Sequence, residues 1–368
     1  MTQYDPARPT DIRVLVVDDS AVVRGLISRQ LNAEAGIGVV ATAANGELAL
    51  AELARREVDV VVLDIEMPVM DGLTALSQIV VRYPAIRVIM ASTLTRRNAE
   101  ISMKALHLGA SDYVAKPETG LGAAEGFRHE LAAKVRALAA TRPRAVVRTP
   151  VAATSSPATP PAPPLTRSPR TRPNVLLIGA STGGPPALLK LFGALKGAVD
   201  QPILLTQHMP PTFTALLADQ LTRAGDRPCA EAKDGDRIKP GHCYIAPGGW
   251  HMTVGRLGAL PILRLNQDPP ENFCRPAVDP LFRTAAQVFG SAALGLILTG
   301  MGSDGAKGCE ALSRAGGHFV VQDEASSVVW GMPGAAAHTG LADGILPLDQ
   351  IGPWVRRVCS APTNGASA

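Results

Sequence analysis

A serine bracketed by glycines, Ser181, is the first residue whose setting suggests chemistry. The apolar run 175–178 predicts a buried strand, and 185–191 predicts the start of a helix with prolines in its first turn. Residues 179–183 fit G-x-S-x-G, in which a sharp strand-to-helix turn presents the serine hydroxyl above the strand ends. Ser181 is therefore a candidate nucleophile. A glycine-rich connection without chemistry, or an anion site at a helix N-terminus, fits the same residues.

Two later strand ends supply the partners that a serine nucleophile needs. His208 follows the predicted strand 202–207, and Asp304 follows the predicted strand 294–299. A histidine can take the serine proton, a buried carboxylate can fix the imidazole tautomer, and backbone N–H groups can stabilise an oxyanion. The chain order Ser, His, Asp differs from the order Ser, Asp, His of α/β-hydrolases, which disfavours that family.

Other histidines compete with His208 for the role of base. His251, in the glycine-containing segment 248–251, is the strongest competitor, and sequence spacing alone leaves it open. The remaining competitors are His242, His318 and His338.

The N-terminal part of the chain carries a second group of reactive side chains. Three carboxylates, a hydroxyl and an ammonium each follow a predicted strand: Asp18, Asp19, Asp64, Ser92 and Lys116. Clustered carboxylates suit a hard cation such as Mg²⁺, and one carboxylate can accept a phosphoryl group. The hydroxyl and the ammonium can hold phosphoryl oxygens. Aspartates at strand ends also serve as helix caps, which is the alternative.

These residues need sheets to bring them together. Between residues 12 and 139, five predicted strands alternate with five predicted helices, which predicts a parallel sheet covered on both faces. Ligands of such sheets bind at the carboxyl ends of the strands. The segment from 174 alternates in the same way, interrupted by a strand-rich region over 229–266 with a hairpin around 255–259. The predicted fold class is therefore α/β twice, with a doubly wound, mostly parallel sheet in the second domain.

Length and composition agree with two domains and exclude several classes of protein. The chain has 368 residues, of which 46% are hydrophobic and 18% are charged. A net charge of +4 is too small to indicate nucleic-acid binding. Five cysteines without C-x-x-C spacing argue against a disulfide framework or a zinc site. With no apolar run of about 20 residues and no signal-peptide pattern, we expect a soluble, cytoplasmic monomer that does not insert into membranes.

A proline-rich segment separates the two domains. Over 141–173, prolines alternate with Ala, Thr, Ser and Arg and no apolar period survives, which predicts a semi-extended spacer rather than a docking site. The expected organisation is a first domain over 1–140, this linker, a second domain over 174–360, and a flexible tail over 361–368.

The first domain resembles the receiver domain of bacterial two-component response regulators. The motifs are VDDS at 17–20, LDIEMP at 63–68, MDG at 70–72 and KP at 116–117, and the resemblance covers residues 12 to about 138. It implies a flavodoxin-like (βα)5 fold, phosphorylation of Asp64 by a histidine kinase, and an Mg²⁺ ion. The metal ligands that it implies are Asp18, Asp19, Asp64 and the Glu66 carbonyl, and the switch or phosphate-contacting residues are Ser92, Lys116 and Tyr113. Tyr113 fits a tyrosine at the edge of the core equally well.

The second domain is similar to the chemotaxis methylesterases of the CheB family. The motifs are GASTGG at 179–184, QHM at 207–209, APG at 246–248 and TGMGSDG at 299–305. The resemblance spans 174 to about 358 and implies that Ser181 is the nucleophile, His208 the base and Asp304 the orienting acid, with an oxyanion donor at the Met301 amide. It implies hydrolysis of glutamate γ-methyl esters on methyl-accepting chemotaxis receptors, and deamidation of glutamines, without a cofactor in the esterase site. It also implies that the unphosphorylated receiver packs over the esterase rim. The linker here is longer and richer in proline than is typical.

Two other interpretations differ in class or target. A response regulator with a DNA-binding output needs a basic recognition helix, and the second half offers a serine-hydrolase set instead. The same esterase chemistry on a receptor-like pathway outside chemotaxis fits the sequence equally well.

Overall fold

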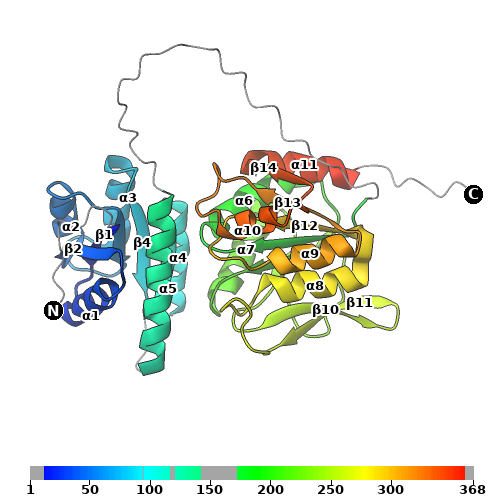
Figure 1. The fold of residues 1–368 in the computed structure, drawn as a ribbon, viewed down its shortest axis with the longest axis horizontal. Coiled ribbons are helices and arrows are strands. Elements are labelled where there is room, and N and C mark those ends of the chain that lie inside the picture. Colours follow the sequence, from blue (N-terminus) through cyan, green and yellow to red (C-terminus); the bar gives the residue numbers. More distant parts are fainter. Residues whose placement is uncertain (1–11, 94, 117–120, 142–171, 361–368) are drawn as a thin grey trace, which may run out of the picture.

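The computed structural model describes residues 12–93, 95–116, 121–141 and 172–360 (Figure 1). Most of the predicted linker and the predicted tail lie outside these residues. The described residues form two α/β units, each built on a parallel sheet. No helix in these ranges is long and apolar enough to cross a membrane.

The N-terminal unit has one five-stranded parallel sheet in the order β2-β1-β3-β4-β5, which confirms the predicted flavodoxin-like arrangement. Its strands are β1 (Ile12–Val17), β2 (Ile37–Ala43), β3 (Val60–Asp64), β4 (Arg87–Ser92) and β5 (Asp112–Ala115). Its helices are α1 (Ala21–Asn32), α2 (Gly46–Leu53), α3 (Gly72–Arg82), α4 (Arg96–His107) and α5 (Leu121–Ala140).

Side-chain caps fix where the helices of this unit begin. Ser20, Asn45 and Asp71 accept hydrogen bonds from backbone N–H groups in the first turns of α1, α2 and α3. Helix α2 ends at Leu53, and the N–H groups of Arg55 and Arg56 both donate to the Glu52 carbonyl.

The C-terminal unit has a seven-stranded sheet in the order β14-β13-β12-β6-β7-β9-β8, and every strand pair in it is parallel. Its strands are β6 (Val175–Ala180), β7 (Ile203–Gln207), β8 (Cys229–Glu231), β9 (Cys243–Ile245), β12 (Ala293–Ile297), β13 (His318–Gln322) and β14 (Gly344–Leu346). A separate antiparallel hairpin joins β10 (His251–Leu257) to β11 (Leu260–Asn266), where a hairpin is predicted.

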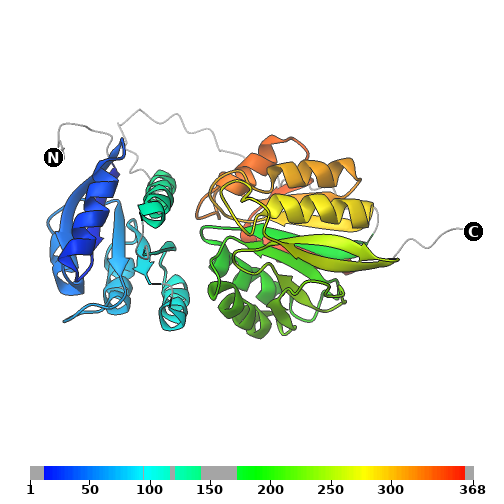
Figure 2. The same ribbon diagram turned by 90° about the horizontal axis from the view of Figure 1, so that it is seen from below.

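Helices cover both faces of this sheet (Figure 2). They are α6 (Gly184–Leu195), α7 (Phe213–Gly225), α8 (Val278–Phe289), α9 (Ala306–Arg314), α10 (Gly331–His338) and α11 (Leu348–Ser360), with a short 3-10 turn η1 (Gly290–Ala292). The predicted strand 294–299 is too long at its end. The β12 ladder stops at Ile297, and the Thr299 N–H donates to the Gln322 side chain instead.

The two units pack against each other through α4 and α5 of the first, which face the second in both views (Figures 1 and 2), and through Tyr113 of β5. Helix α4 lies against α6 and α7. The Tyr113 ring stacks on the Phe213 ring with centroids 4.4 Å apart. Val329 of the C-terminal unit belongs to the same hydrophobic cluster as the core of the N-terminal unit, so apolar side chains pack across the interface.

Candidate active site and phosphorylation site

Ser181 lies on the sharp turn between β6 and α6. Its N–H donates to the Thr299 carbonyl at 3.0 Å, and its carbonyl accepts from the Gly184 N–H at 2.7 Å. Gly183 has a left-handed backbone with φ +75°, and a Cβ there would lie 2.5 Å from Val328. A side chain larger than hydrogen therefore does not fit at position 183, which explains the glycine that follows Ser181 and Thr182.

His208 lies on the neighbouring strand end. The register of β6 and β7 pairs Ala180 with Gln207, so the next residues along the two strands are Ser181 and His208. The His208 N–H donates to the Ala180 carbonyl at 3.1 Å. Gln207 bridges the backbones of these two residues, because its side-chain amide donates to the Ser181 carbonyl at 2.9 Å and to the His208 carbonyl at 3.3 Å.

Asp304 completes an acid–base pair with this histidine. The His208 Nε2 atom is 2.8 Å from Asp304 Oδ2, and the Asp304 side chain is buried. Burial raises the pKa of Asp304, but the hydrogen bond and charge of His208 outweigh that effect and leave the pKa lowered. Burial lowers the pKa of His208, while hydrogen bonds to Asp304 and Cys274 outweigh it and raise that pKa above its ordinary value. The pair thus favours an imidazolium beside a carboxylate.

The second nitrogen of the ring meets a thiol. His208 Nδ1 is 3.4 Å from the Cys274 Sγ atom. Among the described residues, the hydrogen bonds of this ring go to Asp304 and Cys274, and none reaches the Ser181 hydroxyl. The structure therefore brings His208 and Asp304 together and sets Ser181 beside them, with a thiol at the nitrogen that would take the serine proton.

The loop after β12 closes over the serine. A Cβ on Gly300 would lie 2.8 Å from the Ser181 Cβ, so the backbone passes directly over the turn. The Gly300 N–H already donates to the Val329 carbonyl at 2.9 Å. The Met301 N–H makes no hydrogen bond among the described residues, which leaves it available to an oxyanion.

The competing histidines have other partners. His251 is buried, its Nε2 faces the Pro269 carbonyl at 3.2 Å and its Nδ1 accepts from the Ala277 N–H at 3.2 Å. The rings of His242, His318 and His338 contact Pro240, Asp343 and Gly334. Of the five candidates, only the His208 ring lies against Asp304.

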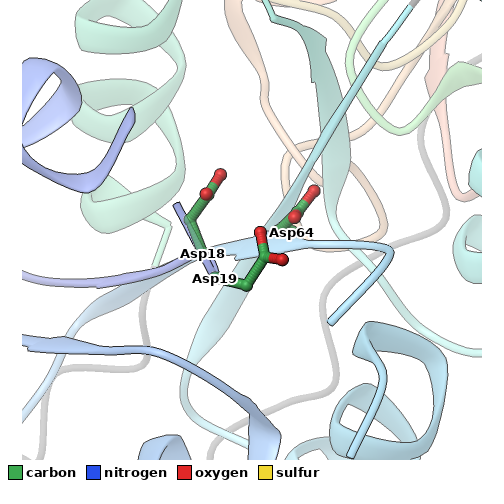
Figure 3. Close-up of side chains that lie close together, drawn as sticks. All are labelled: Asp18, Asp19 and Asp64. Carbon is green, nitrogen blue, oxygen red and sulfur yellow. The ribbon is translucent and has the colours of Figure 1, made fainter. Parts of the chain in front are cut away.

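The N-terminal unit gathers its acids at the carboxyl edge of its own sheet (Figure 3). Carboxylate oxygens of Asp18, Asp19 and Asp64 all lie within 4.8 Å of one another. Asp18 and Asp64 are buried and Asp19 is exposed. Oxygen donors packed this closely repel one another and suit a hard divalent cation, so this cluster has the character of an Mg²⁺ site.

Lys116 neutralises part of that charge. Its ammonium lies 2.6 Å from Asp64 Oδ1 and 2.7 Å from Asp18 Oδ2. Burial alone would lower the pKa of Lys116, but these two hydrogen bonds raise it above its ordinary value. Burial raises the pKa of Asp64, and Lys116 opposes that rise. Asp64 is therefore a shielded carboxylate with a cation on one oxygen.

The other residues predicted for this site, Ser92, Tyr113 and Glu66, make contacts of their own. The Ser92 hydroxyl accepts a hydrogen bond from Ser102 of α4 at 3.0 Å, while its carbonyl accepts from the Lys116 N–H. Tyr113 is buried on Phe213 at the interface. The Glu66 side chain is exposed, and Arg97 lies 3.7 Å from it. A surface hollow of about 420 Å³, lined in part by Asp19, Glu66 and Arg97, opens beside the acids.

The N-terminal unit contacts all three loops that carry the serine, the histidine and the aspartate. Thr182, next to Ser181, donates its hydroxyl to Asp112 Oδ2 at 2.7 Å, and both residues are buried. Phe213, at the start of the helix after His208, stacks on Tyr113. Met301, three positions before Asp304, packs against the hydrophobic core of the N-terminal unit.

Sequence reasoning overlooked several of these residues. Asp112 begins a predicted strand and Thr182 belongs to a glycine-rich turn, and only the tertiary contact reveals them. Asn272 and Cys274 lie in a loop without periodicity. The only signal that points to them is their place shortly before α8, in a domain where other strand and helix ends carry the reactive groups.

The chain is similar to proteins from several bacteria. The profile of the CheB methylesterase family matches residues 176–355, and that of the response regulator receiver domain matches 14–121. A protein-glutamate methylesterase/protein-glutamine glutaminase of Paramagnetospirillum magneticum is 51% identical, covering 96% of this chain and 98% of that protein. The corresponding protein of Azospirillum brasilense is 50% identical, covering 95% and 93%. The crystal structure of the Thermotoga maritima CheB methylesterase catalytic domain is 36% identical with a TM-score of 0.49, covering 50% of this chain and 98% of that chain.

Proposed function

The chain belongs to the CheB family of methylesterases with a receiver domain, and from that premise we propose a specific substrate and mechanism. The enzyme hydrolyses glutamate γ-methyl esters on methyl-accepting chemotaxis receptors and deamidates receptor glutamines. It acts as a monomer in the cytoplasm, and a chemotaxis histidine kinase supplies its phosphoryl group.

Ester hydrolysis proceeds through an acyl-enzyme on Ser181. The Ser181 oxygen attacks the γ-carbonyl carbon while His208 takes the hydroxyl proton, and His208 then gives that proton to the leaving methoxide, which departs as methanol. Water, deprotonated by His208, cleaves the acyl-enzyme and releases a glutamate side chain with the serine restored. With a glutamine substrate the leaving group is ammonia.

Two further groups support this sequence. Asp304 holds the imidazole by its Nε2 atom and stabilises the imidazolium that forms. The Met301 N–H stabilises the negative charge on the carbonyl oxygen. The single observation that supports the proposal most strongly is the 2.8 Å contact between His208 and Asp304, with Ser181 on the adjoining strand end.

The contact between Cys274 and His208 belongs to the resting state in this proposal. Its thiol lies at His208 Nδ1, and the Ser181 hydroxyl takes its place there when substrate binds. Catalytic hydrogen bonds are often long or absent in unliganded enzymes and form only in the substrate complex.

Phosphorylation of Asp64 controls the esterase in the proposed scheme. Asp18, Asp19, Asp64 and the Glu66 carbonyl would hold an Mg²⁺ ion, which would neutralise charge on the phosphoryl oxygens. Lys116 contacts the phosphoryl group, and Ser92 turns from Ser102 toward it. The contacts of Asp112 and Tyr113 with the loops around the esterase site then weaken, and the receptor helix gains access.

Methanol release from a methylated cytoplasmic receptor fragment tests the activity directly. We expect the full chain to release methanol in step with the loss of receptor methyl groups. Methylation that stays constant in the presence of the phosphorylated protein would refute the proposed substrate.

A further inference from the structure

The tight turn at 271–274 contacts both members of the acid–base pair. Cys274 N–H donates to the Glu271 carbonyl at 2.9 Å, and the two residues between them have positive φ, +53° for Asn272 and +62° for Phe273. Positive φ at both central residues is the geometry of a type I′ turn, in which asparagine is tolerated and a bulky residue is strained. Cys274 contacts His208, and Asn272 contacts Asp304 from the same turn.

Asn272 donates to two buried carboxylates with one amide nitrogen. Its Nδ2 atom lies 2.9 Å from Asp304 Oδ1 and 3.0 Å from Asp279 Oδ2. Each carboxylate residue is only 1% exposed, although Asn272 itself lies at the surface. An amide nitrogen carries two protons, so it can serve both acceptors at once.

Asp279 needs such a partner because it lies beside a second acid. Its Oδ1 atom accepts from the Gly305 and Gly308 N–H groups at 3.0 and 2.7 Å. Burial, followed by the charge of Asp304, raises the pKa of Asp279. Asp304 accepts backbone N–H groups as well, from Val278 at 2.6 Å and from Asp279 at 3.1 Å. Asn272 is the side chain that lies between the two charges.

We infer that Asn272 is a positioning residue that keeps Asp304 charged and aimed at His208 by donating to Asp304 and Asp279 together. The inference rests on the proposed function for its catalytic meaning, but its geometric basis is independent of substrate. The other titratable or charged groups around the pair are Cys274, Arg283 of α8 with its partner Glu271, and the Cys309 thiol of α9.

Replacing Asn272 with aspartate isolates this role. Asn272→Asp keeps the size of the side chain and tolerates positive φ, yet it replaces two donated hydrogen bonds with a third negative charge. More negative charge beside His208 and Asp304 raises the affinity of the His208 imidazole for a proton. We expect the titration midpoint of the His208 imidazole, followed by NMR in the full chain, to rise by about one pH unit.

The kinetic effect should follow the same change. At neutral pH, kcat should fall about tenfold, because a midpoint that is one pH unit higher leaves about tenfold less neutral imidazole at any pH well below it. The loss should shrink as the pH rises. A turn that was only loosened would lower kcat at every pH without moving the His208 midpoint, and that result would overturn the inference.

Two further variants complete the test. Phe273→Asp places the same charge at the next position of the same turn, where the side chain is fully exposed, and it should leave the midpoint near that of the wild type. The double variant Asn272→Asp with Asp279→Asn exchanges the amide and the carboxylate between these two contacting positions and restores the original net charge. It should therefore return the His208 midpoint to the wild-type value. If Asn272→Asp does not fold, Asn272→Gly, which fits φ +53°, should still lower kcat relative to Phe273→Gly.

The outcomes separate this inference from the proposed function. A wild-type chain without esterase activity whose His208 midpoint still responds to Asn272→Asp would refute the function and keep the positioning role. An active wild type whose midpoint and kcat are unmoved by Asn272→Asp, or moved equally by Phe273→Asp, would refute the positioning role alone.

Discussion

Two reactive sites lie at the carboxyl edges of two parallel sheets, and they differ in what surrounds them. In the receiver, three carboxylates lie close together and Lys116 contacts two of them. The cluster is open to solvent, because Asp19 is exposed and lines a surface hollow. In the esterase, Asp304 of the acid–base pair is buried, His208 is half-buried, and the receiver contacts the loops around them. The receiver site is therefore open to a charged group, while the esterase site has its acid–base pair in place but its loops covered.

One short strand links the two sites. Lys116, which contacts Asp64, follows the end of β5. Asp112 and Tyr113, which contact Thr182 and Phe213 of the esterase, begin the same strand. A change at Lys116 can thus reach the serine loop through four residues of packed backbone. Substitutions on the esterase side should lower the rate, and substitutions at this contact should raise it.

Removing the nucleophile should have the largest effect. Ser181→Ala should reduce kcat for methanol release by roughly 10⁶-fold, and His208→Ala by a similar factor, because members of a catalytic unit are not additive. Single-turnover rates with methylated receptor measure both. If His251→Ala were inactive and His208→Ala active, the assignment of the base would be wrong.

Changing the acid should cost less. Asp304→Asn should lower kcat by about 10⁴-fold, because the amide no longer stabilises the imidazolium or selects its tautomer. Receptor binding, measured separately, should not change. A loss of binding with normal kcat would show that Asp304 serves the fold rather than the chemistry.

Opening the interface from the receiver side should have the opposite sign. Asp112→Ala removes the hydrogen bond from Thr182 and leaves Lys134 with Glu130 as its remaining carboxylate partner, at 2.9 Å. A hydrogen bond to a charged group is worth about 1.5–3 kcal/mol, so the unphosphorylated full chain should become about tenfold more active. Glu52→Ala on α2, which breaks a surface ion pair with Arg56, serves as the control and should have no effect. An unchanged rate in Asp112→Ala would mean that the contact does not limit access.

The smallest expected effect concerns pH. The pKa of His208 is raised above 6.5, and a protonated imidazole cannot act as a base, so kcat should increase with pH through neutrality. The contact between His208 Nδ1 and the Cys274 sulfur contributes to that rise in pKa, because the protonated ring donates its N–H to the sulfur. Cys274→Ala should therefore move the acid limb of the kcat profile to lower pH, whereas Cys229→Ala, a partly buried cysteine on β8, should leave it in place. A limb that moves upward in Cys274→Ala would contradict this assignment.

The apolar runs of the sequence were sufficient to predict most of the fold. The five receiver strands, the strand before Ser181 and the strand before His208 are short, mostly apolar segments of a buried parallel sheet, and they form where predicted. Apart from the short turn η1, three elements of the described residues were not predicted: α9, α10 and β14. α10 contains glycine and proline, β14 has three residues, and α9 follows a glycine-rich loop, so each gives a weak local signal.

The contacts that distinguish the two sites could not be predicted from the sequence. Asp112 and Thr182 are 70 positions apart and belong to different domains, and nothing in either local sequence specifies the other. Asn272 and Cys274 act from a turn whose hydrogen bonds are made across the fold. Residue types at strand ends suggested the candidate chemistry, whereas the covering of the esterase site is a property of tertiary packing.

The most direct test of the account is the ratio of methanol-release rates with and without acetyl phosphate and Mg²⁺, measured on the full chain. We expect phosphorylation to accelerate the wild type, to add little to the already open Asp112→Ala variant, and to have no effect on Asp64→Asn. Full stimulation of Asp112→Ala, or stimulation that survives in Asp64→Asn, would contradict the claim that Asp64 controls the esterase through this interface.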